Sequence, residues 1–124
     1  MKKKNSKQLT QAEEEIMQVL WQKEQAFVKD ILADLPDPKP AYNTVSTIVR
    51  ILEDKGFVDH RSYGRTHQYF PKIKKEDYAK KQVKKLLGNY FQGSPSSMLS
   101  FFLKEKELSV NELDEILNDI KKEK

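Results

Sequence analysis

The segment from Tyr42 to Lys55 carries short polar side chains at helical spacing, and their chemistry suits contact with the edges of DNA bases. A helix here would bury one apolar stripe, formed by Val45, Ile48, Val49 and Leu52. Its opposite face would present Asn43, Ser46, Thr47 and Arg50. Such short side chains permit close approach to another surface, and an arginine fork reaches guanine edges or phosphates. We therefore predict nucleic-acid contact at this face, with an ordinary solvated polar face as the competing interpretation.

A glycine-containing hairpin follows that helix and offers two more cations. Two short strands, at 57–61 and 66–70, would be joined by a four-residue loop that contains Gly64. Arg61 and Arg65 lie at the two ends of this loop, with a tyrosine between them. Such a loop suits contact with a phosphate backbone or insertion of an arginine into the minor groove. Two exposed arginines are also common in proteins that bind no DNA.

Two further helices must hold these residues in place. Thr10 and Glu13 have the spacing of a capping box, so the first helix should start there and run to about Trp21. A shorter second helix ends before the proline-rich stretch at 36–40. Three helices followed by a hairpin is the order of a winged helix-turn-helix, whose recognition helix enters the major groove. The predicted fold class is mainly α with a small β-hairpin.

The rest of the chain predicts three more helices with too much apolar surface for so short a segment to bury. They start near Lys75, at Ser94, and at a second capping box formed by Ser109 and Glu112. Pairing with a second copy would cover this surface. We expect a flexible basic N-terminus at 1–8, a winged-helix DNA-binding domain at 9–73 and a helical dimerisation domain at 74–124. The predicted dimer contacts are Leu86, Leu87, Tyr90, Phe102, Leu103, Leu113, Ile116, Leu117 and Ile120.

Composition bears on the other classes of function. The net charge of +4 suits a polyanionic partner, although it is shared equally by the two halves of the chain. The absence of cysteine excludes disulfides and thiolate metal sites. His60 and His67 are the only histidines, and two ligands alone do not make a metal site, so we expect no bound metal. We also expect no cofactor and no catalytic residues. A hydrolase centred on these two histidines is a remote alternative. Without a signal peptide or a membrane-length apolar run, we expect a cytoplasmic protein that does not insert into membranes.

Several blocks of residues together resemble the BlaI/MecI family of penicillinase repressors. They are spread along the chain from about residue 8 to residue 120, and their combined spacing is more specific than a lone helix-turn-helix pattern. The matching blocks are Leu9–Trp21, Ala41–Thr47, Leu52–Val58, Gly64–Pro71, Met98–Phe102 and Lys106–Ser109.

The resemblance implies a homodimer that binds a palindromic operator in double-stranded DNA and represses genes of β-lactam resistance or a related stress response. Relatives often have arginine at the position of Ile51, whereas this chain has it one residue earlier, at Arg50. The operator sequence therefore stays open. Together with the hairpin cations, the predicted DNA-binding residues are Tyr42, Asn43, Thr44, Ser46, Thr47, Arg50, Arg61 and Arg65.

The resemblance also implies relief of repression by proteolysis in the C-terminal domain, through a pathway that starts at a membrane-bound sensor metallopeptidase. Well-known members are cut at an Asn-Phe bond, and the matching bond here is Ser100-Phe101. A cut there would separate Phe101 and everything after it from the preceding helix. Serine in place of asparagine leaves the mode of inactivation open. The copper-sensing branch of the family carries cysteine motifs, which this chain lacks.

A second hypothesis keeps the fold but assigns it another partner. A winged helix is also able to serve as a protein–protein module, with Ser46, Thr47 and Tyr63 as a polar docking face. Salt distinguishes the two, because phosphate neutralisation releases counterions and makes DNA binding steeply salt-dependent.

Overall fold

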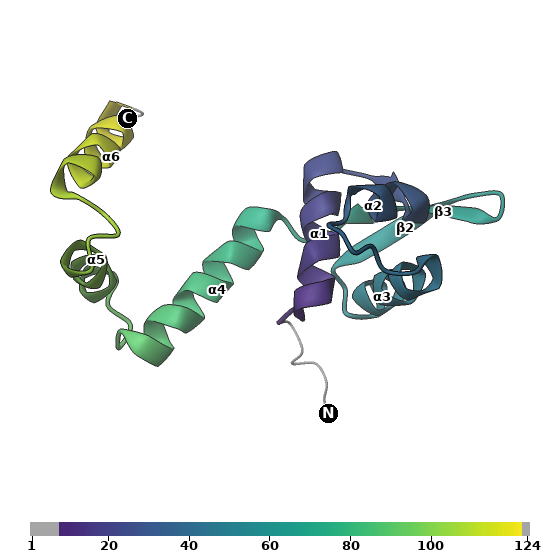
Figure 1. The fold of residues 1–124 in the computed structure, drawn as a ribbon, viewed down its shortest axis with the longest axis horizontal. Helices are drawn as coiled ribbons and strands as arrows, with labels where there is room; N and C mark the ends of the chain where they lie inside the picture. The colour runs from purple at the N-terminus through teal and green to yellow at the C-terminus, as the bar shows by residue number, and fades with distance from the viewer. Residues whose placement is uncertain (1–7, 123–124) are drawn as a thin grey trace. The chain divides into compact units, whose positions relative to one another are not determined.

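The described part of the chain, residues 8–122 of a computed structural model, forms six helices and three short strands (Figure 1). The first helix, α1 (Gln11–Lys23), begins at the predicted capping box. The Glu13 backbone N–H donates to the Thr10 hydroxyl at 3.1 Å, and the Thr10 N–H donates to the Glu13 carboxylate at 2.9 Å. The capping box is confirmed. The expected flexible N-terminus at 1–8 lies, apart from Gln8, outside the described residues.

Helices α2 (Val28–Asp34) and α3 (Tyr42–Asp54) follow α1 and pack with it around one apolar core. Gly56 lies just after the end of α3, and its φ of 88° is the left-handed conformation that glycine adopts without strain. The Gly56 N–H donates to the Glu53 carbonyl and the Phe57 N–H to the Leu52 carbonyl, at 3.0 and 2.9 Å. Gly56 therefore caps the C-terminal end of this helix. The most deeply buried side chains of the core are Phe57, Ile16, Met17, Leu20, Ile31, Leu52, Val45, Val49 and Val58.

The sheet has one strand more than the predicted hairpin. Strands β2 (Val58–Tyr63) and β3 (Thr66–Pro71) pair antiparallel, and the two-residue strand β1 (Ala26–Phe27) pairs with the other edge of β3. A strand of two residues has no periodicity to detect, and only its pairing with β3 defines it. The loop is also tighter than expected. Strand β2 continues to Tyr63, so Gly64, with φ of 63°, and its neighbour make a two-residue turn that projects from the helices (Figure 1).

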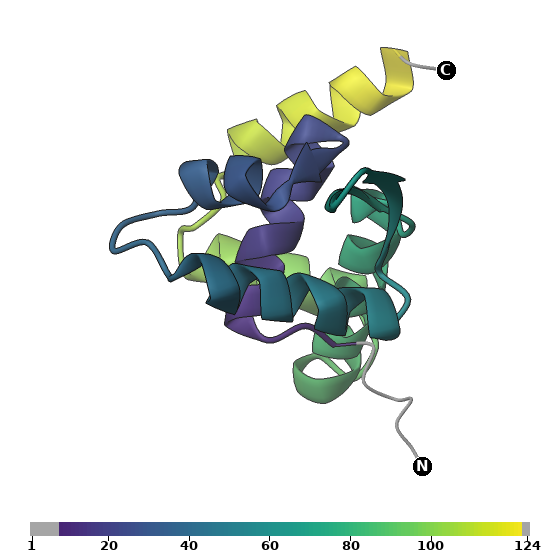
Figure 2. The ribbon, with the colours of Figure 1, turned by 90° about the vertical axis from the view of Figure 1, so that its right-hand side faces the viewer.

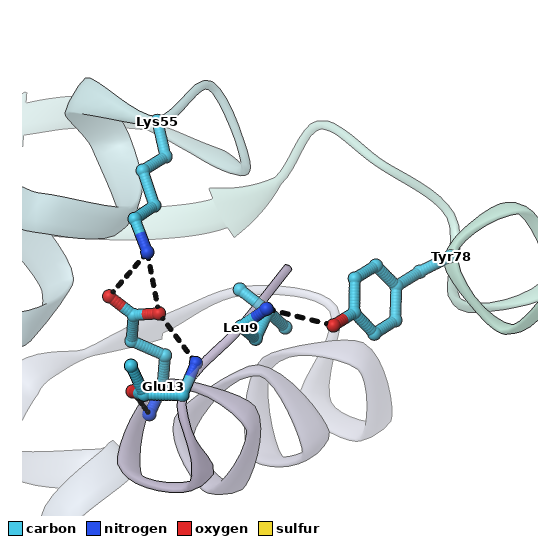
Figure 3. A network of polar contacts seen from close by, with 5 residues as sticks. Leu9, Glu13, Lys55 and Tyr78 are labelled. Carbon is cyan, nitrogen blue, oxygen red and sulfur yellow. Dashed lines mark hydrogen bonds and ion pairs between the residues drawn. The ribbon is translucent and has the colours of Figure 1, made fainter. Parts of the chain in front are cut away.

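A small polar network ties both ends of this unit together (Figure 3). Lys55, just after α3, donates from its Nζ to both Glu13 carboxylate oxygens at 2.8 and 3.0 Å. The Leu9 N–H donates to the Tyr78 hydroxyl at 2.9 Å. The Tyr78 ring is buried, with ring centroids 6.0 Å from Trp21 and 5.7 Å from Phe57. Contacts between residues far apart in sequence thus hold the start of α1 and the side chain of Tyr78 against the same core.

We expect Glu13→Gln to cost about 1–3 kcal/mol of unfolding free energy near pH 7, because it leaves a buried ion pair without its anion. Burial raises the pKa of the Glu13 carboxyl, but bonds from Lys55 and Thr10 outweigh it, so the pKa is lowered overall. The folded-state pKa is then below the unfolded one. This stabilisation is therefore complete above the unfolded pKa and is lost as the pH falls through the folded value.

Urea unfolding of both proteins from about pH 7 down to about pH 3 measures this linkage. The gap between wild type and Glu13→Gln should shrink toward acid pH. Glu14→Gln is the matched control, since Glu14 lies in the same first turn but is exposed. A gap that does not change with pH, or an equal loss in both variants, would contradict the role given to the ion pair.

The chain divides into two compact units, one ending at Tyr78 and one beginning at Ala79. The second unit contains most of α4 (Lys75–Tyr90), then α5 (Pro95–Lys104) and α6 (Val110–Lys122). Helix α5 starts at Ser94, whose hydroxyl accepts from the Ser97 N–H at 3.1 Å. The predicted capping box of the last helix is confirmed by two bonds between Ser109 and Glu112, at 2.9 and 3.0 Å. Among the described residues, no helix is both long enough and apolar enough to cross a membrane.

Candidate nucleic-acid interface

Helix α3 presents one polar side to solvent because its other side is locked into the core. Val45, Val49 and Leu52 are all fully buried. Their burial fixes the rotation of the helix, so the residues on the opposite side point outward. Figure 2 shows α3 along the edge of the unit, with α1 behind it. The predicted contact residues on this side are exposed, apart from the partly exposed Ser46; they are Tyr42, Asn43, Thr44, Ser46, Thr47 and Arg50.

A groove runs between α3 and the hairpin and brings part of the predicted site together. Its volume is about 440 Å³. Tyr42, Ser46 and Arg50 enter it from α3, and Arg65 enters it from the turn between β2 and β3. Asn43, Thr44 and Thr47 lie on α3 outside this groove. The remaining lining residues are Phe27, Val28, Lys29, Thr66, His67 and Tyr69.

The side chains of the two hairpin arginines lie in different places. Arg65 lines the groove, whereas the Arg61 guanidinium lies 4.5 Å from the centroid of the Phe70 ring. Arg61 pairs in register with Gln68, well before the turn, because β2 extends further than predicted. A cation held on an aromatic face still contacts solvent, and Arg61 is exposed. The structure therefore separates Arg61 from the groove that Arg50 and Arg65 share.

Three cations give the groove its positive character. Lys29, at the start of α2, joins Arg50 and Arg65 in the lining. Sequence reasoning missed Lys29, because nothing in the short helix α2 distinguishes this lysine from any other solvated one. Burial raises the pKa of the Tyr69 hydroxyl, and the nearby Glu53 adds to the effect while Arg50 opposes it. Tyr69 therefore stays neutral near pH 7 and offers the groove a hydroxyl rather than a charge.

The two histidines lie side by side on the paired strands β2 and β3. Their rings are stacked, with centroids 4.1 Å apart and planes 2° apart. His67 lines the groove, while His60 Nδ1 lies 3.0 Å from the Glu53 carboxylate. His60 is thus held by α3 through a carboxylate that sequence spacing did not connect with it.

The second unit shows apolar side chains to solvent when the chain is taken alone. Of the predicted dimer contacts, Leu87 is buried, and Phe102, Leu103 and Leu113 are partly buried. The exposed ones are Leu86, Tyr90, Ile116, Leu117 and Ile120. The Ser100-Phe101 bond lies inside α5, and the exposed Phe101 ring contacts Phe91, with centroids 5.7 Å apart.

Comparison with known proteins gives consistent results over nearly the whole chain. Residues 9–122 match the family model described as penicillinase repressor. The methicillin resistance regulatory protein MecI of Staphylococcus aureus is 26% identical over 116 residues, which cover 93% of this chain and 94% of that protein. The penicillinase repressor of Bacillus licheniformis is 30% identical over 121 residues, covering 94% of each.

Two solved structures resemble the fold. The DNA-binding domain of the repressor BlaI matches with a TM-score of 0.51 and 29% identity, over 57% of this chain and 88% of that one. The protein hsRosR-S4 matches with a TM-score of 0.54 over 82% of this chain and 91% of that one; at 16% identity it supports the fold alone. Since the family model spans almost every described residue, the chain belongs to the penicillinase repressor family.

Proposed function

We propose that this protein is a DNA-binding transcriptional repressor that acts as a homodimer on a palindromic operator. The observation that carries the proposal is the groove between α3 and the hairpin, into which Arg50 and Arg65 project from two different elements. A winged helix uses these two elements on DNA, the helix for bases and the hairpin for the backbone. The similarity to a penicillinase repressor, to the regulatory protein MecI and to the DNA-binding domain of the repressor BlaI supports a DNA-binding repressor.

In this proposal the exposed side of α3 enters the major groove. Asn43, Ser46 and Thr47 supply compact donors and acceptors for base edges, and Arg50 supplies a fork that matches guanine O6 and N7. Tyr42 and Thr44 flank this set on the same helix. Arg65 and Arg61 contact the sugar-phosphate backbone from the hairpin, and Lys29 adds a phosphate contact from α2. Phosphate contacts place the helix, and base contacts select the sequence.

The homodimer follows from the apolar surface of the second unit. Exposed leucines and isoleucines on α4 and α6 are covered if two copies pair around a two-fold axis. Two linked winged helices then bind the two halves of a palindrome, and the second half-site is bound as an intramolecular step. The contacts proposed are the nine residues predicted from Leu86 to Ile120.

Relief of repression by proteolysis fits the same scheme. A cut at Ser100-Phe101 would detach α6 and the end of α5 from the rest of the chain. Because the bond lies within a helix, a protease must first unwind that turn. The sensor metallopeptidase pathway of the resembling repressors would supply the signal, and repression itself would take place in the cytoplasm, where the operator is.

The salt dependence of DNA binding tests the proposed function. Fluorescence anisotropy with a labelled duplex from upstream of the protein's own gene gives the dissociation constant at several salt concentrations. Raising salt from about 50 to about 200 mM should weaken binding by about a thousandfold, since each neutralised phosphate releases counterions. A shuffled duplex is the control for specificity. Absence of binding at low salt would overturn the proposal and favour a protein-docking surface at Ser46, Thr47 and Tyr63.

A further inference from the structure

Two carboxylates and one imidazole meet where the end of α3 lies against β2. Glu53 belongs to the last turn of α3, and Asp59 and His60 are neighbours on β2. One donor atom from each lies within 4.8 Å of the other two. His60 Nδ1 is 3.1 and 3.0 Å from the two Glu53 carboxylate oxygens. None of the three residues belongs to the DNA contacts proposed above.

The donor set suits one transition-metal dication. Donors bound to the same Zn²⁺ at about 2.0–2.2 Å lie roughly 3–4 Å apart, so small side-chain movements would complete the site. An imidazole nitrogen with two carboxylates fits Zn²⁺, with water as the fourth ligand. Mg²⁺ and Ca²⁺ prefer six or more oxygens, which this site does not offer. Two carboxylates also balance the charge of one dication.

The surroundings hold these donors in place. The Asp59 carboxylate accepts a hydrogen bond from the His60 backbone N–H at 2.8 Å. The His67 ring stacks on the His60 ring and limits its rotation. The side chains of His60 and Glu53 are 27% and 30% exposed, which leaves a path for an ion and for a water ligand. An ion pair between His60 and Glu53 supplies only one positive charge for two neighbouring carboxylates, so the cluster keeps a net negative charge.

We propose that Glu53, Asp59 and His60 form a binding site for a single Zn²⁺-type ion that joins the recognition helix α3 to the strand β2. The ion would also act on DNA binding, a consequence that rests on the proposed function. Glu53 is one turn beyond Arg50, so two carboxylate charges lie near the positive groove. A dication neutralises them and removes their repulsion of DNA phosphates. Metal binding should therefore tighten the complex.

Metal titration of the full-length protein without an affinity tag tests the site. Isothermal titration calorimetry with Zn²⁺, and the visible absorption of Co²⁺, should both show one saturable site per chain. We expect His60→Asn and Glu53→Gln each to weaken metal binding at least about tenfold. The matched control is Asp54→Asn, which removes the neighbouring carboxylate of α3 that is not part of the site and should stay within about twofold of wild type.

Two results would overturn the site: no saturable binding by the wild type, or equal binding by His60→Asn and Asp54→Asn. Glu53→Gln alters a partly exposed residue at the end of a helix, so it keeps the test valid if His60→Asn misfolds. Zn²⁺ should tighten operator binding about threefold to tenfold in the wild type and leave Glu53→Gln unchanged. Metal binding without this effect would overturn the link to DNA. If the proposed repressor function is wrong, the result is different again, because the protein then binds no duplex either with or without Zn²⁺.

Discussion

Replacing Arg50 with alanine should weaken operator binding by about thirtyfold or more. A bidentate arginine–guanine contact is worth about 1–3 kcal/mol, and a dimer loses one such contact in each half-site. Arg50 is exposed and lines the groove between α3 and the hairpin, so its removal leaves the core intact. Anisotropy titrations at constant salt give the ratio of dissociation constants. Arg65→Ala should instead weaken all duplexes alike and flatten the salt dependence, as expected for a phosphate contact.

A lysine at position 50 separates the charge of Arg50 from its planar shape, and a second variant is a control for the loss of a cation elsewhere. Arg50→Lys keeps the charge but loses the planar fork, so it should recover little of the specific affinity and more of the affinity for a shuffled duplex. Lys23→Ala removes a cation of the same unit that pairs with Asp34 at 3.1 Å and is not among the groove residues. It should bind DNA nearly as tightly as wild type. Unchanged operator binding by Arg50→Ala would remove Arg50 from the proposed interface.

Local signals made much of the fold predictable. The capping boxes at Thr10 and Ser109 and the glycine cap at Gly56 depend on residues three to five positions apart, so the sequence contains all the information they need. Strand β1 depends instead on pairing with β3, more than forty residues later. The bond from Leu9 to Tyr78 spans 69 positions. No spacing rule connects such pairs, and only the packed fold reveals them.

In the candidate site, too, local spacing predicts some features, whereas others depend on how distant segments pack. The polar side of α3 was predictable because a buried stripe at helical spacing determines which residues face away from it. The grouping of Arg50 with Arg65 rather than Arg61 depends on the register of the hairpin, which a two-residue turn sets. Nothing in the sequence distinguishes Glu53 from the other polar residues of α3. Its place beside His60 appears only when the helix end and the strand are packed together.

Introducing two charges into the apolar side of α6, with Leu113→Asp and Leu117→Asp together, should convert the proposed dimer to monomers. Leu117 is 45% exposed and Leu113 is partly buried in the single chain, so a partner copy is what would cover them. A buried, unpaired carboxylate costs several kcal/mol, and a symmetric interface meets each one twice. Analytical ultracentrifugation measures the mass. Operator affinity should fall by about a hundredfold or more, because linkage of the two half-sites is lost.

The matched control for this pair is Asn111→Asp with Asn118→Asp, which adds the same two charges to the opposite side of the same helix. It should remain dimeric and keep its affinity for the operator. Circular dichroism must show equal helix content in both double variants, so that a monomer is not explained by loss of α6. If the leucine variant sediments as a dimer and binds the operator like wild type, the two chains must be joined elsewhere than through α6. If it becomes monomeric but keeps full affinity, each winged helix holds its half-site independently, and a cut at Ser100-Phe101 could not relieve repression by separating the chains.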